Sequence, residues 1–260
     1  MTKAITKARR ITRGLGLADN TGAVIWEGPS LIDGEPIAVV MTFGSTNRKT
    51  GDIHQTWIIP TTISPLDAIR TGADGSVCGG CGHRPVLVKA AKAAGLEPEA
   101  PCYVNVGQAP QGIYRKFAAD GYPRITVEQA ALIVSGSTVR FGAWGDPGAV
   151  PAYVWQALAD SADDHTGYTH RWQDSGRDLV GLMMASVDTR AEMIEAWADG
   201  WATFRVEKSR DAMHDATKGE AICPSAKVSC EACPLKCNGD TGKVAGRRIL
   251  DHGPGGEGRA

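Results

Sequence analysis

The seven cysteines of this chain fall into two groups, and their spacing is the feature with the most chemical meaning. The first group is Cys78, Cys81 and Cys102. The second group is Cys223, Cys230, Cys233 and Cys237. Cysteines that serve only as small core hydrophobes would be scattered along the chain. We therefore predict that all seven thiols are metal ligands.

The second group places four thiols within fifteen positions, so they lie close together in any fold. Four thiolates complete either a tetrahedral zinc site or a cubane iron–sulfur cluster. Structural zinc sites usually pair two Cys-x2-Cys knuckles, and this group has one, whereas Cys233-Pro234 is typical of cluster-binding loops. The pattern favours an iron–sulfur cluster, with zinc and disulfide bonds as the alternatives.

The first group has three thiols, which would leave one coordination position open for a small molecule. Its glycines, among them Gly79 and Gly80, would let the loop wrap closely around a cofactor. His83 is either a further ligand, a hydrogen-bond donor to a cluster sulfur, or an exposed loop histidine. The pattern thus predicts one closed and one open centre.

Composition narrows the class of protein. The 260 residues can bury one large core or two modest ones, and a net charge of −1 gives no long-range field for a polyanion. We find no secretory signal and no apolar run of about eighteen residues, and therefore expect a cytoplasmic protein without a membrane span. In a reducing compartment, clustered cysteines favour metal ligation over disulfide bonding.

Two segments precede the first cysteine group. Residues 1–20 are basic and predict a flexible arm, which is either a solvated terminus or a contact for nucleic acid. Residues 21–62 predict a small antiparallel β region with strands at Ala23–Trp26, Pro36–Thr42 and Gln55–Pro60. Its most polar turn, residues 47–52, is either a substrate loop or a hairpin tip.

Residues 63–215 predict a core of alternating helices and strands. After a short helix capped by Ser64 and a second one over Pro85–Ala94, the predicted strands are Cys102–Val106, Thr138–Trp144, Gly167–His170, Leu179–Val187 and Ala202–Val206. The predicted helices between them are Gln111–Asp120, Thr126–Val134, Pro151–Asp160 and Thr189–Asp199, two of which open with a capping box. Repeated βα units predict an α/β fold with a parallel-stranded full or partial (β/α) barrel. Residues 216–243 would form a cysteine-rich metal-binding segment, and residues 244–260 a disordered tail.

Polar residues gather where the predicted strands end, and ligands of such folds bind at the carboxyl ends of the strands. These residues include Asn105, Gln108, Asp146, His170, Arg171, Ser186, Asp188, Arg205 and Glu207. We interpret them as one cavity rim. The alternative is that βα loops are always polar and that helix caps account for part of the set.

The pair Cys102-Tyr103, followed one βα unit later by Gly145-Asp146-Pro147, resembles the radical S-adenosylmethionine enzymes. The resemblance implies that the first cysteine group holds a four-iron cluster and the second an auxiliary cluster. It also implies that Gly145, Asp146, Ser186 and Asp188 bind S-adenosylmethionine, and that Asp146, Tyr168, His170 and Arg205 act in catalysis. The segments Arg140–Pro147 and Met184–Asp188 also resemble uncharacterised proteins of bacteriophages and prophages.

Two other functions stay open. One is a non-catalytic, metal-stapled phage-type protein that binds nucleic acid through its basic arm. The other is a hydrolase or nuclease that uses Asp146, His170 and Asp188 with a divalent metal. The radical interpretation requires Cys102 to reach Cys78 and Cys81, although twenty residues separate it from Cys81.

Overall fold

Nine strands form one sheet in the computed structural model, which describes residues 3–17, 20–97, 101–174, 177–207, 218–242 and 245–250. In their order across the sheet, the strands are β1 (Gly22–Pro29), β2 (Pro36–Thr42), β3 (His54–Pro60), β4 (Thr138–Phe141), β5 (Asp164–Thr169), β6 (Met184–Val187), β7 (Thr203–Glu207), β9 (Gly246–Leu250) and β8 (Glu220–Ile222). The helices are α1 (Lys3–Gly14), α2 (Pro65–Thr71), α3 (Gly75–Cys78), α4 (Pro85–Ala93), α5 (Ala109–Ala118), α6 (Val127–Val134), α7 (Ala152–Ser161) and α8 (Arg190–Ala198). The predicted α/β class is confirmed.

Most of the sheet is parallel. β1, β2 and β3 form an antiparallel meander, and β3 then pairs in parallel with β4. From β3 to β7 the neighbours follow chain order and run parallel, and β9 and β8 continue the parallel edge. The three N-terminal strands, predicted as a separate β region, are therefore one side of the same sheet.

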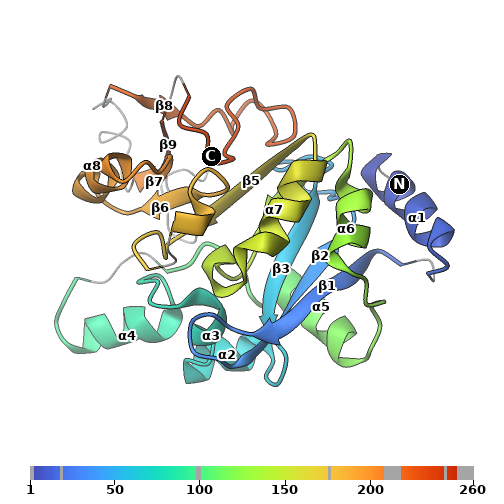
Figure 1. Cartoon of the computed structure of the whole chain (residues 1–260). Coiled ribbons are helices and arrows are strands. Elements are labelled where there is room, and N and C mark those ends of the chain that lie inside the picture. The colour runs from blue at the N-terminus through green and yellow to red at the C-terminus, as the bar shows by residue number, and fades with distance from the viewer. Residues whose placement is uncertain are drawn as a thin grey trace.

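The core lies where helices cover this sheet. Figure 1 shows α6 and α7 side by side, and they contact β1 and β4, respectively. On β4, Val139 and Phe141 are fully buried, and the Phe141 ring lies 5.2 Å from that of Trp155 on α7. Because side chains alternate along a strand, Thr138 and Arg140 face the other side of the sheet.

The predicted helix starts are confirmed at three places. Ser64 accepts a hydrogen bond from the backbone N–H of Asp67 at the start of α2. Thr126 and Thr189 each form the predicted capping box, at α6 and α8. These caps satisfy N–H groups that have no partner within the helix, so local sequence fixes where each helix begins.

Three predicted segments differ from the structure. Residues 102–106 form no strand, because no neighbouring strand pairs with them among the described residues. β6 begins only at Met184, after a short 3-10 helix at Arg177–Leu179. Residues 246–250, predicted as part of a disordered tail, form β9 in the interior of the sheet, while residues 251–260 lie outside the described residues. The sequence pattern did not predict β9, because Arg247 and Arg248 make this segment polar. Arg248 is nevertheless buried, and its guanidinium lies 3.7 Å from Glu207.

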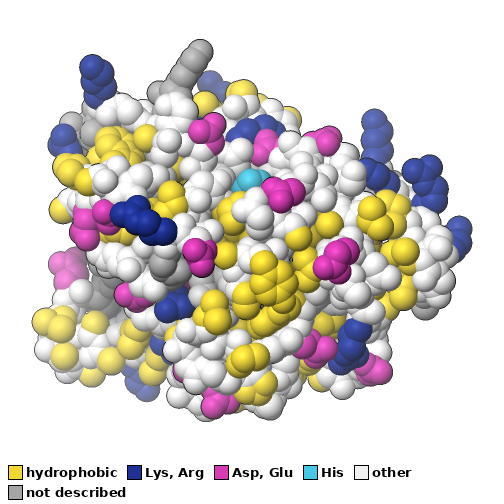
Figure 2. All heavy atoms as spheres, viewed as in Figure 1, with side chains coloured by type: hydrophobic (Ala, Val, Ile, Leu, Met, Phe, Trp, Pro, Cys, Tyr) yellow, Lys and Arg dark blue, Asp and Glu magenta, His cyan; other side chains and the backbone are white. Residues whose placement is uncertain are grey.

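The basic N-terminal segment, predicted as a flexible arm, forms α1 and packs on α6. Ala4 and Ala8 are buried, and the backbone N–H of Ala4 donates to Asp52 at 2.9 Å. Figure 2 shows Lys and Arg side chains gathered on the surface over α1. Nucleic-acid binding by this helix stays a prediction. Among the described residues, no helix has the length and apolar character needed to cross a membrane.

Candidate metal centres

The first cysteine group begins at the carboxyl end of β3. After β3 and α2, the one-turn helix α3 ends at Cys78, and Gly79 follows with a φ of 60°. A Cβ at Gly79 would lie 2.9 Å from Cδ of Arg171, so only glycine lets that arginine lie against the loop. Cys81 follows two residues later, and its N–H donates to the carbonyl of Cys78.

Arg84 holds this loop in place. Its guanidinium donates to the carbonyl of Gly79 at 2.7 Å, to the carbonyl of Gly72 at 2.6 Å, and to Oδ1 of the buried Asp74 at 2.8 Å. A planar fork with several donors can bridge backbone segments in this way, whereas a lysine ammonium would lose the geometry. Arg84 therefore orders the segment that carries Cys78 and Cys81.

Cys102 lies close to this loop, although twenty residues separate it from Cys81 along the chain. Its backbone N–H donates to the carbonyl of His83 at 2.9 Å. Burial raises the pKa of the Cys81 thiol to about 12, and the charge of Cys102 adds to this rise. Burial likewise raises the pKa of Cys78 well above its usual range, with contributions from Cys81 and Cys102. The hydrogen bond to His83 therefore places Cys102 beside the segment that carries Cys78 and Cys81.

Two histidines lie at the same centre. One ligand atom each of Cys81, His83 and His170 falls within 4.8 Å of the others. His83 Nε2 lies 3.0 Å from Oδ1 of Asp188, which follows β6, and the two imidazole rings lie 5.2 Å apart. Burial lowers the pKa of His170, which favours the neutral imidazole that binds metals. Carboxylate–histidine–metal chains are typical of metal sites, since the carboxylate orients the ring.

Asp146 connects the turn after β4, the end of β5 and the first cysteine loop. Its carboxylate accepts hydrogen bonds from the N–H of Gly148 at 2.8 Å, the hydroxyl of Thr169 at 2.6 Å and the N–H of His170 at 2.8 Å. Its own N–H donates to the carbonyl of Val77, next to Cys78, at 2.6 Å. Asp146 therefore positions His170 and the first cysteine loop relative to each other. It lies on the turn that follows β4, where Gly145 has a φ of 83° and packs on Ile58 of β3.

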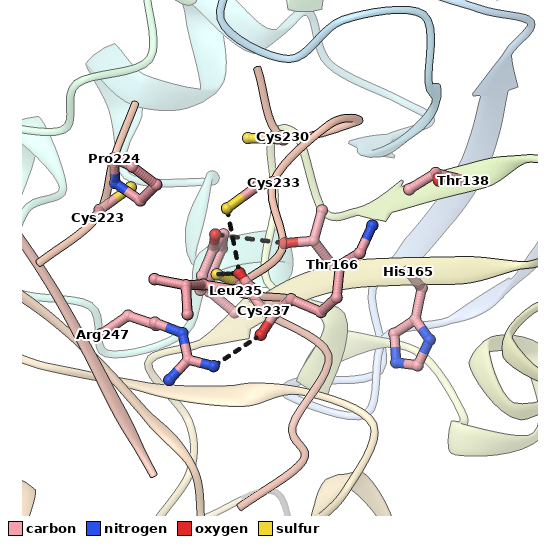
Figure 3. Close-up of a pocket in the computed structure, with 12 residues that line it drawn as sticks. Thr138, His165, Thr166, Cys223, Pro224, Cys230, Cys233, Leu235, Cys237 and Arg247 are labelled. Atoms are coloured by element: carbon pink, nitrogen blue, oxygen red, sulfur yellow. Dashed lines mark hydrogen bonds between the residues drawn. The ribbon is translucent and has the colours of Figure 1, made fainter. Parts of the chain in front are cut away.

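The second cysteine group lines a cavity of about 40 Å³. All four cysteines contribute to its wall, together with Thr138 of β4, Thr166 and Tyr168 of β5, and Arg247 of β9. Figure 3 shows the four cysteines around the cavity with Thr138, Thr166 and Arg247, and Cys223 lies beside Pro224. All seven cysteines lie in the described part of the chain, and none forms a disulfide. The donor set fits a tetrahedral zinc ion or a cubane iron–sulfur cluster.

Two backbone contacts hold this second loop on the sheet. The N–H of Gly167 in β5 donates to the carbonyl of Cys237 at 3.1 Å, along the part of β5 that β6 leaves unpaired. The polar turn at residues 47–52 provides the other contact, since Lys49 and Thr50 accept hydrogen bonds from Cys230 and Glu231. This turn, for which the sequence allows a substrate loop or a hairpin tip, thus supports the second centre.

The residues with predicted catalytic or binding roles lie at different places. His170, Asp146 and Asp188 lie near His83 and the first cysteine loop, whereas Tyr168 lines the cavity of the second cysteine group. Glu207 and Glu220 form ion pairs with the guanidinium of Arg205. Ser186 is buried in β6, in register with Phe204 of β7.

Sequence reasoning misses two arginines, Arg84 beside His83 and Arg140 within a predicted strand. The signal for Arg140 is a cation inside an otherwise apolar run, Thr138–Trp144.

No family model matches the chain, and no curated protein or solved structure is significantly similar to it. The interpretation of both centres therefore comes from their side chains and from their place on the sheet.

Proposed function

We propose that the protein is an iron–sulfur enzyme of the radical S-adenosylmethionine type. Cys78, Cys81 and Cys102 would hold the catalytic four-iron cluster, and the four C-terminal cysteines would hold an auxiliary cluster. The observation that supports the proposal is the hydrogen bond from the N–H of Cys102 to the carbonyl of His83, which brings Cys102 back beside Cys81 across the twenty residues between them. Three thiols at one place leave a position for a small molecule, as the open centre of such an enzyme needs.

The order of elements supports the same proposal. The first cysteine group follows β3, and the Gly145-Asp146-Pro147 turn follows β4, its parallel neighbour in the sheet. β5, β6 and β7 continue in chain order, as in a partial (β/α) barrel. Ligands of parallel α/β folds bind at the carboxyl ends of the strands, which is where His170 and Asp188 also lie.

The proposed roles follow from the hydrogen bonds at the first centre. When bound, a cluster of this kind supplies the electron that activates S-adenosylmethionine for hydrogen abstraction. Oδ2 of Asp146 accepts a hydrogen bond from the N–H of His170, and its second lone pair offers an acceptor position for the cofactor's amino group. His83, oriented by Asp188, and His170 would line the substrate side and hold or donate protons there. Tyr168 would belong to the auxiliary centre instead.

Anaerobic purification followed by iron and sulfide analysis tests the proposal. We expect brown protein with two clusters, whose visible absorbance bleaches on reduction and which cleaves S-adenosylmethionine. Cys102→Ser should remove one cluster and the cleavage activity, whereas Cys233→Ser should remove the other cluster only. Colourless protein that contains stoichiometric zinc and no sulfide would refute it.

A single divalent ion is the second candidate, and one observation favours it. Cys81, His83 and His170 can reach one ion, and three protein ligands with an open fourth position are typical of catalytic zinc. Such a site would activate water for hydrolysis, with Asp188 orienting His83. His170→Ala separates the two functions. It should abolish metal binding and hydrolysis if this candidate holds, and should leave the iron content unchanged if the cluster does.

A further inference from the structure

Arg140 of β4 lies between the two cysteine groups, and among the described residues no Asp or Glu forms an ion pair with it. Three other arginines that lie against the sheet or the first loop are paired: Arg84 with Asp74 at 2.8 Å, Arg205 with Glu220 at 2.8 Å, and Arg248 with Glu207 at 3.7 Å. Arg140 therefore carries a positive charge that the described carboxylates leave unbalanced.

The position of Arg140 is fixed by the sheet. It is in register with Gln55 of β3 and with Thr166 of β5, and Thr166 lines the cavity of the second cysteine group. One guanidinium nitrogen donates to the hydroxyl of Tyr103 at 2.7 Å. Nε is buried and has no hydrogen-bond partner among the described residues. The guanidinium thus sits on the cavity side of the sheet, with a donor that no described acceptor satisfies.

Two residues that line the cavity of the second cysteine group flank Arg140. Thr138 lies two positions earlier on the same face of β4, and Thr166 is the register partner of Arg140 on β5. A metal site converts all four thiols to thiolates, and four thiolates around a zinc ion or a cubane cluster leave a net negative charge. A cation that is partly withdrawn from water and has no counter-charge is costly, whereas the same cation beside an anionic centre is stabilised.

We propose that Arg140 is the counter-charge of the second centre, a positioning residue that makes metal loading favourable. The proposal rests on the proposed function only in needing the four C-terminal cysteines to bind a metal, whether iron–sulfur or zinc. It requires Arg140 to affect stability in opposite directions with and without bound metal. Without metal, the charge of Arg140 destabilises the fold, and with metal it stabilises the second centre.

Zinc binding by the full-length protein tests this, with the second centre identified as the site that Cys233→Ser abolishes. In competition with a chelator, Arg140→Gln should bind zinc there about 10–100-fold more weakly, as is usual when a partner of metal ligands is removed. Arg140→Lys keeps the charge and should lose much less. Arg124→Gln, which removes an arginine paired with Glu27 and Asp120, is the matched control and should bind zinc normally.

Thermal unfolding supplies the second readout. Arg140→Gln should lower the melting temperature of the zinc-loaded protein but leave that of the metal-free protein unchanged or raised, whereas a merely structural arginine would lower both. Normal zinc affinity in Arg140→Gln, or equal destabilisation of the zinc-loaded and metal-free proteins, would overturn this inference but not the proposed function. A parent protein whose C-terminal cysteines bind neither zinc nor iron would overturn the proposed auxiliary centre as well, and that is measured first.

Discussion

Replacing Asp146 with alanine should destabilise the protein strongly, because this carboxylate joins the turn after β4 to the end of β5. It accepts hydrogen bonds from the N–H groups of Gly148 and His170 and from the hydroxyl of Thr169. The two backbone donors cannot turn to other acceptors, and a stranded buried donor costs about 1–3 kcal/mol. Asp146→Ala should therefore lower the free energy of unfolding by about 2–6 kcal/mol, the cost of two such donors. For a chain of this size, each kcal/mol corresponds to a fall of about 2–4 °C in melting temperature.

Chemical denaturation of the metal-free protein measures this, since a loss in that state cannot come from a missing metal. Asp146→Asn should lose less than alanine, because its amide oxygen still accepts from one side. Asp160→Ala is the control: this aspartate accepts a hydrogen bond from Gln156 at the protein surface, so its loss should be small. If Asp146→Ala unfolded at the wild-type denaturant concentration, Asp146 would not hold the strand ends together, and its role in positioning the first centre would be refuted.

Three further results are expected. Arg205→Met should cost about 3–5 kcal/mol of stability without changing metal content, because it leaves the fully buried carboxylate of Glu220 unpaired; unchanged stability would contradict the ion-pair role. The metal-free protein should lose stability as the pH rises from about 9 towards 12, because burial raises the pKa of Cys81 and Cys237 to about 12 and the unfolded chain then binds fewer protons than the folded one. The expected loss is up to about 1.4 kcal/mol per pH unit for each thiol. Urea unfolding at several pH values measures this slope, which the metal-loaded protein should lack. Metal removal should speed tryptic cleavage after the exposed Lys227, since the second loop has little regular structure of its own; equal cleavage rates with and without metal would count against a metal centre there.

Local chemistry made part of the site predictable. The spacing of Cys223, Cys230, Cys233 and Cys237 confines four thiols to a short loop, so their proximity does not depend on the fold. The place of Cys102 depends on how the residues between it and Cys81 fold, and the structure hydrogen-bonds its N–H to the carbonyl of His83. Spacing along the chain did not indicate that Tyr168 lines the cavity of the second cysteine group or that Arg205 pairs with Glu207 and Glu220, because both depend on which strands lie side by side.

Three features were predictable from the order of residues: the α/β class, the starts of α2, α6 and α8, and the division of the cysteines into two groups. These depend on neighbours along the chain: capping side chains, apolar periodicity and short spacings. The pairing of distant segments placed the N-terminal strands in the same sheet as the parallel ones, β9 in its interior, and Arg140 between Tyr103 and the cavity-lining Thr166. These features depend on which strands pair and which charges are buried, and such contacts join residues far apart in the chain.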